Sequence, residues 1–337
     1  MYSNDTKSLP VQDAPDIAGL TFRHFRGDED YPDILAINTA SKLADGLNYD
    51  LHTLETISYS YSNTANHDPY KDMLIAEVDG KMVAFNRVFM ERELDGSRVY
   101  THFGFVLPEY RGKGLGRAMI RWAEARIRER EAEQQGGGPA YYNTSVASRA
   151  AHLEDLLKEG GYKPVRYEFV METPDLNNIP EVPMPEGLEI RPVTPDQYRA
   201  IFEGNVEAFR DHWGASEIEP EEFDRWLNHP LSQPNIWVVA WDGDQVAGSI
   251  LNYIIEDMNE KTGRKVGYTE SISVRRPWRR KGLARAMLSH SMKMHRDLGM
   301  EQTALGVDTE NPSGALQLYE SMGYVVTGKD TTYRKPV

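Results

Sequence analysis

The chain has 337 residues, enough for two hydrophobic cores, and 40% of them are apolar, so neither half need be disordered. Its formal charge of −14 disfavours nucleic acid as a main partner, and the lack of cysteine excludes disulfides, thiolate metal sites and a cysteine nucleophile. No apolar run reaches the roughly 18 residues of a membrane span, and residues 1–17 contain no signal-peptide core.

The first half predicts a mixed α/β domain over residues 18–172, after a disordered lead at 1–17. A strand at 21–25 leads into helical segments, and a hairpin follows around Asp79 and Gly80. The later expected elements are a strand at 99–106, a helix ending near Glu131, a strand at 139–145, a helix at 148–158 and a strand at 162–171. Antiparallel strands followed by a βαβ-like end predict a largely antiparallel sheet flanked by helices.

The second half, residues 187–337, predicts the same elements in the same order. They are a strand at 189–193, a hairpin of 236–241 and 246–254, a strand at 267–274, a helix ending near Asp297, a strand at 302–307, a helix at 311–321 and a strand at 324–333. Residues 173–186 contain four prolines and are expected to form a semi-extended linker between the two domains.

Sequence matches between the halves indicate a duplication. The stretch VLPEYRGKGLGRAMI (Val106–Ile120) returns as VRRPWRRKGLARAML (Val274–Leu288), at an offset of 168 residues. Shorter matches in the same order are Gly19–Arg23 with Gly187–Arg191, and Gly161–Tyr162 with Gly323–Tyr324. Repeats in a constant order predict two tandem α/β (α+β) domains of one fold.

Each copy of the long repeat has the features of an anion site. Glycine lets a ligand approach the backbone, and the first N–H groups of a helix have no internal partner, which favours phosphate. A tight turn without a ligand is the alternative for one copy, and two copies disfavour it. The glycine spacing does not match a Rossmann or Walker-type loop. The predicted residues are Arg279, Arg280, Lys281, Gly282, Leu283, Ala284 and Arg285, and more weakly Arg111, Gly112, Lys113, Gly114, Leu115 and Gly116.

These segments resemble the pyrophosphate-binding motif of the GNAT superfamily of N-acetyltransferases, Arg/Gln-x-x-Gly-x-Gly/Ala. From about Leu20 to Tyr333 the chain resembles a tandem GNAT protein. The resemblance implies acetyl-CoA, or another acyl-CoA, bound along the strand before the second turn. The strand residues that it implies for this contact are Ile272, Ser273 and Val274, and more weakly Val106 in the first copy. It also implies a backbone oxyanion donor near Ser273–Val274.

The second half supplies candidates for acid and base chemistry. Glu270 lies on an apolar strand face, which is unusual for a carboxylate, and acts either as a base or as the partner of a nearby arginine. The resemblance implies that Tyr319 protonates the leaving sulfur and that Asn311 contacts the pantetheine arm. The alternatives are a tyrosine that only packs and an asparagine that caps a helix starting at residue 311.

The first half departs from this pattern. Aligning the two Gly-Tyr pairs places Leu157 opposite Tyr319, and a leucine cannot donate a proton. The offset of 168 places His102 opposite Glu270, where it is either a base or an ordinary strand histidine. We therefore predict a catalytic C-terminal domain and a degenerate N-terminal one.

The acceptor is less clearly defined by the sequence. The acidic segment 211–224 contains His212 and Trp213, which suits a cationic amine through charge and cation–π contact, or forms a solvated helix start. The histidines show no paired metal spacing. We expect a cytoplasmic N-acetyltransferase acting on a small-molecule or peptide amine, without nucleic-acid, membrane or metal partners. The alternative is a non-catalytic acyl-CoA-binding or sensing protein.

Overall fold

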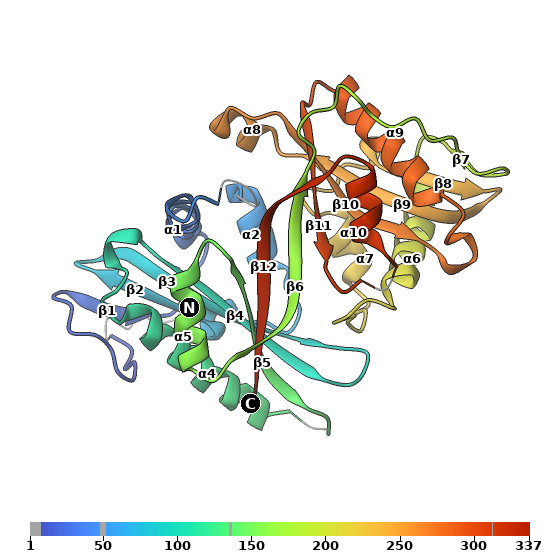
Figure 1. Ribbon diagram of the computed structural model, residues 1–337. Coiled ribbons are helices and arrows are strands. Elements are labelled where there is room, and N and C mark those ends of the chain that lie inside the picture. The colour runs from blue at the N-terminus through green and yellow to red at the C-terminus, as the bar shows by residue number, and fades with distance from the viewer. Residues whose placement is uncertain (1–7, 48–51, 135–136, 312) are drawn as a thin grey trace. The chain divides into compact units, whose positions relative to one another are not determined.

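The chain forms two compact units of similar construction. The computed structural model describes residues 8–47, 52–134, 137–311 and 313–337. Unit 1 comprises Met1–Val165 and Thr332–Val337, and unit 2 comprises Arg166–Thr331. Each unit is a mixed, mostly antiparallel sheet flanked by helices, which confirms the predicted fold class (Figure 1). Within the described residues, no helix is long and apolar enough to cross a membrane.

Unit 1 has its strands in the order β1-β2-β3-β4-β5, antiparallel except for the parallel pair of β4 and β5. The elements are β1 (Leu20–Arg23), α1 (Tyr31–Ala44), α2 (Leu54–Ser62), α3 (Pro69–Asp72), β2 (Met73–Val78), β3 (Lys81–Arg92), β4 (Arg98–Val106), α4 (Leu115–Ala132), β5 (Ala140–Ala147), α5 (Ala151–Glu159) and the start of β6 (Lys163–Glu172).

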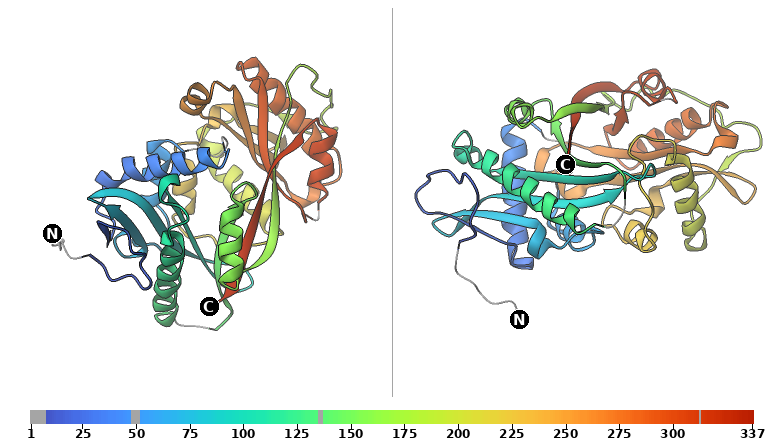
Figure 2. Two further views of the ribbon diagram at one scale, coloured as in Figure 1. Left: turned by 60° about the vertical axis from the view of Figure 1, so that its left-hand side comes forward. Right: turned by 90° about the horizontal axis from the view of Figure 1, so that it is seen from below.

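The alternation of side chains along β2 places helices on both faces of this sheet. Met73 and Ile75 pack with α1 and α2, whereas Leu74 and Ala76 pack with the start of α4. Figure 2 shows helices of unit 1 on both sides of its strands. Successive residues of a strand point to opposite faces, so a strand buried on both sides reads as a continuous apolar run. The sequence Met-Leu-Ile-Ala of β2 is such a run.

Part of the expected N-terminal lead is held against unit 1. The N–H of Leu9 donates to the carbonyl of Phe22 at 2.8 Å, and the N–H of Phe22 donates to Ser8 Oγ at 3.0 Å. Leu9 and Val11 also pack against the apolar cluster around α4. The expectation of disorder is therefore wrong for residues 8–17, because this stretch carries apolar side chains that extend the core. Residues 1–7 lie outside the described part of the chain.

Unit 2 has its strands in the order β6-β11-β10-β9-β8-β7, antiparallel except for the parallel pair of β10 and β11. The elements after β6 are β7 (Glu189–Ile190), α6 (Tyr198–Phe209), α7 (Glu222–Leu227), β8 (Val238–Asp242), β9 (Gln245–Ile254), α8 (Glu256–Thr262), β10 (Val266–Val274), α9 (Leu283–Asp297), β11 (Gln302–Asp308), α10 (Ala315–Ser321) and β12 (Val325–Pro336).

Helices α9 and α6 cover opposite faces of this second sheet. Val238 and Ala240 of β8 pack with α9 residues such as Met287. The alternate residues Val239 and Trp241 belong to a separate cluster. That cluster also contains Ile201 of α6, so α6 covers the face of the sheet opposite to α9.

The last strand of each half is exchanged. Strand β6, encoded by the first half, pairs with β11 of unit 2 from Glu168↔Asp308 to Glu172↔Ala304. The last residues of β12 in turn lie beside β5 of unit 1, where the N–H of Val337 donates to the carbonyl of Ala140 at 3.0 Å.

The division between the units therefore falls at 165/166 and 331/332, not in the proline-rich segment expected as a linker. Residues 173–186 belong to unit 2. Leu176 is buried in its core, and Ser289 Oγ of α9 donates to the carbonyl of Pro180 at 2.6 Å. Proline prevents regular structure here, but the apolar residues between the prolines still pack.

One helix begins later than predicted. Helix α10 starts at Ala315, after Gly314 with φ of 78°, instead of at residue 311. Asn311 is thus not its N-cap; its Oδ1 accepts from the N–H of Ser313 at 2.9 Å. The glycine adopts the left-handed conformation at little cost, which allows the chain to turn before the helix starts.

The packing of α9 on β10 depends on a missing side chain. A Cβ at Gly267 would lie 2.1 Å from Nδ1 of His295, whose ring is fully buried. We expect Gly267→Ala to lower the free energy of unfolding of unit 2 by about 1–3 kcal/mol, the usual cost of overpacking. Urea unfolding followed by circular dichroism measures it.

The matched control is Gly116→Ala in α4. Its Cβ would lie 3.7 Å from Leu156, an ordinary contact, and the second copy already carries Ala284 there. This variant should be neutral or slightly stabilising, since alanine favours a helix. Equal losses in the two variants would contradict the packing argument.

Candidate functional site

The turn between β10 and α9 presents unpaired amides. Gly282 adopts φ of 85°, and helix α9 begins at the next residue. All of residues 280–285 are described, and none of their N–H groups donates to a backbone carbonyl; the first to do so is Ala286, to Gly282 at 3.1 Å. A Cβ at Gly282 would meet nothing within 4 Å, so the space at the turn is open. This is the backbone arrangement that binds a phosphate group.

Arg279, expected to bind the cofactor, faces inward instead. Its Nε donates to the carbonyl of Val274 at 2.9 Å, its Nη1 to Asp211 at 2.9 Å and its Nη2 to the carbonyl of Ala208 at 3.0 Å. Arg276 shares Asp211, and hydrogen bonds from Arg276 and then Arg279 hold the pKa of that carboxyl well below its usual range. Arg279 therefore stabilises the turn by tying it to the end of β10 and to the end of α6.

The two turns differ in how their positive charge is used. Arg280 and Lys281 are exposed and form no ion pair with any described residue. In unit 1, Arg111 pairs with Asp45 at 2.7 Å, Arg117 pairs with Glu159, and Lys113 lies over the Tyr110 ring. The turn of unit 2 thus keeps more charge available for an anion than the turn of unit 1.

Strand β10 contains a bulge beside this turn. Its pairing with β9 shifts between Glu270↔Leu251 and Ser273↔Ser249, so Ser271 and Ile272 lie opposite a single residue. Ser271 adopts φ of 50°, which is unusual for a residue with a Cβ, and its carbonyl accepts from Asn205 Nδ2 of α6 at 3.3 Å. A bulge leaves ladder groups unpaired and redirects side chains, and bulges are common at functional sites.

The parallel strands β10 and β11 separate next to the bulge. Their ladder covers only Val266–Tyr268 with Gln302–Ala304, although β10 continues to Val274 and β11 to Asp308. The end of β11 pairs with β6 on its other edge, and the end of β10 pairs with β9. The facing edges of β10 and β11 are therefore open to an extended ligand arm. Ile272, Ser273 and Val274 lie along this edge.

Glu270 and Tyr319 belong to opposite faces of the sheet. Thr269 faces α9 and α10, since its Oγ1 lies 3.2 Å from the hydroxyl of Tyr324, and the adjacent Glu270 therefore faces α6. Tyr319 is buried on the α10 side. Burial, then Tyr324 and Glu270, raise its pKa above the usual value, so its hydroxyl stays protonated at neutral pH. The facing edges of β10 and β11 lie between these two faces.

Unit 1 lacks both groups. Strand β4 pairs with β3 without a break from Ala84↔Val106 to Arg92↔Arg98, so it has no bulge. Because β10 has one extra residue at the bulge, residues before the bulge align with β4 at an offset of 167 instead of 168. His102 then corresponds to Thr269, not to Glu270: its Nε2 lies 2.8 Å from the hydroxyl of Tyr162, as Thr269 contacts Tyr324.

The predicted equivalence of His102 and Glu270 is therefore wrong by one residue, because a constant offset cannot include a bulge. The position of Glu270 is occupied by Phe103 in unit 1, and that of Tyr319 by the buried Leu157. Arg149, aligned with Asn311, donates to the carbonyl of Gly46 at 2.7 Å.

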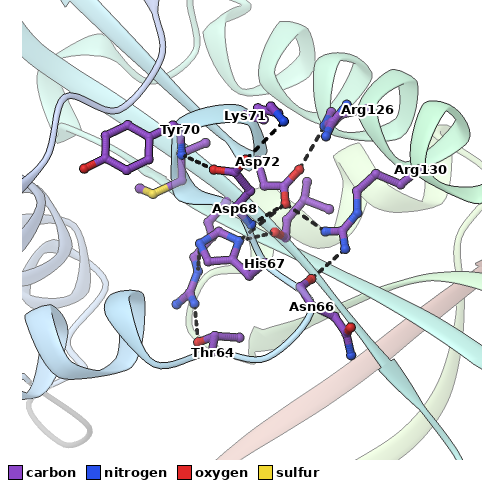
Figure 3. Close-up of polar contacts among 12 residues, drawn as sticks. Thr64, Asn66, His67, Asp68, Tyr70, Lys71, Asp72, Arg126 and Arg130 are labelled. Carbon is purple, nitrogen blue, oxygen red and sulfur yellow. Dashed lines mark hydrogen bonds and ion pairs between the residues drawn. The ribbon is translucent and has the colours of Figure 1, made fainter. Parts of the chain in front are cut away.

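The face of unit 1 that corresponds to Glu270 is filled by its own side chains. Arg87 is 3% exposed, its guanidinium lies 4.2 Å from the ring centroid of Tyr61, and its Nε donates to His67 Nε2 at 3.2 Å. His67 lies near Asp72, which also pairs with Arg126 and Arg130 of α4 (Figure 3). Unit 2 pairs Glu270 with the apolar Leu251 on this face, whereas unit 1 pairs Phe103 with the buried cation Arg87.

Of the acidic segment 211–224 expected beside the acceptor, residues 211–221 lie in the loop between α6 and α7, and residues 222–224 begin α7. Trp213 is 41% exposed, and the Arg166 guanidinium already lies 5.5 Å from its ring centroid. His212 packs on Phe209 with 4.5 Å between ring centroids. One cation–π position of the indole is thus used internally, which weakens the expectation that it receives the substrate amine.

Comparison with known proteins identifies the family. The model of the acetyltransferase (GNAT) family matches residues 38–135 and 198–324, more than half of the chain. The chain belongs to the GNAT family. It is therefore an acetyltransferase that uses acetyl-CoA, and the open glycine turn with its unpaired amides and free cations fits the diphosphate of that donor.

Similar GNAT proteins span the full length of the chain. Mycothiol acetyltransferases of Nocardiopsis dassonvillei and Salinispora arenicola are each 25% identical, over 90% and 95% of this chain and 92% and 98% of theirs. The structure of a GCN5-related N-acetyltransferase from Sphaerobacter thermophilus is 26% identical with a TM-score of 0.72, covering 96% of both chains. A tandem GNAT protein from the clavulanic acid pathway, 15% identical over 94% of this chain and 98% of its own, shares the fold with a TM-score of 0.67.

Buried histidines make the stability of this GNAT chain depend on pH. Burial lowers the pKa of His67, His102 and His295 to about 4, from 6.5. Below pH 6.5 these histidines bind protons in the unfolded chain but stay neutral in the folded one. Their contribution to the free energy of unfolding is therefore fully present above pH 6.5 and is lost as the pH falls. We expect a loss of about 2 kcal/mol per histidine by pH 5, measured by urea unfolding.

The variant His102→Gln tests the assignment. It retains a hydrogen-bonding side chain beside Tyr162 but cannot titrate, so the fall in stability between pH 6.5 and 5 should become shallower. An unchanged slope would show that His102 is not a source of the pH dependence.

Proposed function

We propose that the chain is an acetyl-CoA-dependent N-acetyltransferase in which unit 2 carries out direct transfer to a primary amine. The observation that carries the proposal is the asymmetry of the two units. Only unit 2 combines the bulged strand, a carboxylate at Glu270 and a tyrosine at position 319 with a turn that keeps free cations. Unit 1 has phenylalanine and leucine at the two chemical positions, and its Arg87 is packed inside.

Each side chain has a defined part in the proposed reaction. Acetyl-CoA supplies the acetyl group as a thioester. Glu270 accepts a proton from the attacking amine, directly or through water, so that a lone pair becomes available. The nitrogen–carbon bond forms as the carbon–sulfur bond breaks, and Tyr319 gives its hydroxyl proton to the departing sulfur. The nitrogen then loses a second proton to water, which leaves a neutral amide, and solvent returns a proton to Tyr319. Two protons thus leave the nitrogen, one is gained by the sulfur and one is released to solvent; general acid–base steps of this kind contribute about 10²–10⁴-fold each.

The remaining residues bind and orient the donor. The amides of 280–285 with Arg280, Lys281 and Arg285 hold the diphosphate, and the open edge of β10 at Ile272–Val274 pairs with the pantetheine arm. Asn311, three residues beyond the end of β11, contacts the same arm. A backbone N–H near Ser273 stabilises the developing oxyanion, the usual role of such donors.

The substrate class follows from charge. The carboxylate of Glu270 belongs to the α6 side of unit 2, which favours an acceptor that arrives as a cation and loses a proton there. A small-molecule amine agrees with the name of the mycothiol acetyltransferases, although the identity of 25% does not carry their acceptor to this chain.

The acid assignment is tested with Tyr319→Phe. Loss of the hydroxyl should lower kcat by about 10²–10³-fold while the Kd for acetyl-CoA stays within twofold, since packing is retained. Release of CoA thiol with a panel of primary amines measures turnover. The matched control is Tyr324→Phe, which loses hydrogen bonds with Thr269 and Thr303 but no proposed chemical group. Equal losses of kcat in the two variants would contradict the assignment.

The binding turn is tested by removing one lysine from each unit. Lys281→Ala should weaken acetyl-CoA binding about tenfold in titration calorimetry, because a charge-assisted contact with a phosphate contributes about 1.5–3 kcal/mol. Lys113→Ala, at the repeated position in unit 1, should leave the Kd unchanged. The opposite pattern would place the donor in unit 1.

A non-catalytic acyl-CoA-binding protein is the second candidate, because the turn alone would support binding. It predicts acetyl-CoA binding that depends on Lys281 without CoA release for any amine in the panel. Amine-dependent thiol release removes this candidate.

A further inference from the structure

Arg166 joins three segments of unit 2. It lies on β6, and its side chain is 15% exposed. Its Nη2 donates to Asp308 at 2.6 Å and its Nη1 to Glu310 at 2.9 Å, while its guanidinium lies 5.5 Å from the ring centroid of Trp213. A planar guanidinium can pair through its edge and stack through its face at the same time, which lysine cannot do.

The carboxylates held by Arg166 begin the segment that carries two proposed site residues. Asp308 is the last residue of β11, Asn311 follows three residues later, and Tyr319 lies on α10 beyond it. The backbone supports the same position, because the N–H of Thr309 donates to the carbonyl of Tyr167 at 3.0 Å. Arg166 thus helps to set where β11 ends and where this segment departs.

The loop after α6 is anchored at two points. At one, Asp211 accepts hydrogen bonds from Arg276 and Arg279. These arginines precede residues 280–285, the turn proposed to hold the diphosphate, here called the diphosphate turn. At the other, Trp213 stacks on Arg166. Helix α6 packs on the face to which Glu270 belongs, so a loop that continues from its end borders the acceptor side of the opening between β10 and β11.

We propose that Arg166 is a positioning residue that links binding of acetyl-CoA to the ordering of the loop Asp211–Trp213 on the acceptor side of unit 2. The inference rests on the proposed function of unit 2. A ligand that fixes the diphosphate turn and the segment after β11 fixes both anchors of the loop, and ordering one end lowers the entropic cost of ordering the other. The indole of Trp213 then forms a wall of the acceptor site, with Arg166 behind it.

Hydrogen exchange measured by mass spectrometry on the full chain tests this inference. Acetyl-CoA should slow amide exchange in residues 210–218 about tenfold in the wild-type chain, and less than twofold in Arg166→Ala. Protection of residues 280–288 by acetyl-CoA should be the same in both. Equal slowing of the loop in both chains overturns the inference and leaves the proposed function intact, whereas no protection at 280–288 in the wild type overturns both.

Three controls separate positioning from a general structural role. Trp213→Phe keeps an aromatic face and should retain the response of the loop, and Trp213→Ala should lose it. Tyr167, the residue after Arg166 on β6, also makes a cation–π contact: Lys329 Nζ lies 4.0 Å from its ring centroid. Lys329→Ala removes this contact and should leave the response of the loop unchanged. If Arg166→Ala raises exchange equally in α9 and β11 without acetyl-CoA, Arg166 only stabilises the unit and the inference is wrong.

Discussion

The bulge in β10 is the constraint on which the site depends. One extra residue interrupts a ladder that is regular in the corresponding strand of unit 1. Ser271 there has φ of 50°, and its carbonyl accepts a hydrogen bond from Asn205. Downstream of the bulge both strands run into similar glycine turns. Upstream of it, the extra residue decides which side chain faces α6, and in unit 2 that side chain is a glutamate. A non-glycine residue at positive φ costs free energy and persists only where its surroundings impose that conformation. Such residues cluster at functional sites, which agrees with the place of this bulge beside the turn.

The same comparison explains how two units of one fold come to differ in chemistry. The turns, the separating parallel strands and the repeated tyrosines are shared, because they belong to the backbone. The differences lie in a few side chains: Phe103 for Glu270, Leu157 for Tyr319, and Arg87 with His67 packed where unit 2 has apolar Leu251. Apolar substitutions at chemical positions cost no stability in a core and can even improve packing. Unit 1 therefore keeps its structure without keeping the proposed reaction.

Much of this architecture is predictable from the sequence, and the errors have physical causes. The order of elements and the glycine turns follow from periodicity and from one repeated motif. The GNAT family was indicated by the resemblance of that motif and is shown by the family match. The equivalence of His102 with Glu270 could not be predicted correctly, because a bulge has no fixed signature and a constant offset ignores it. Arg279 was expected to face the ligand, but a sequence does not show that Asp211 and two carbonyls would hold it inward. The proline-rich segment lies between the two sequence repeats, but it is not the boundary between the units. Because β6 and the end of β12 each pair in the other unit, the units divide at 165/166 and 331/332.

The exchange of strands has a consequence for synthesis in the cell. Unit 1 includes Thr332–Val337, which are made after all of unit 2, whereas its other described elements are made before unit 2. The edge of β5 that β12 later covers therefore remains without its partner strand while unit 2 is being made. An open strand edge invites pairing with other chains. Unit 1 thus depends on residues made after unit 2 to complete its sheet, and a chain whose synthesis stops before Thr332 has an incomplete unit 1.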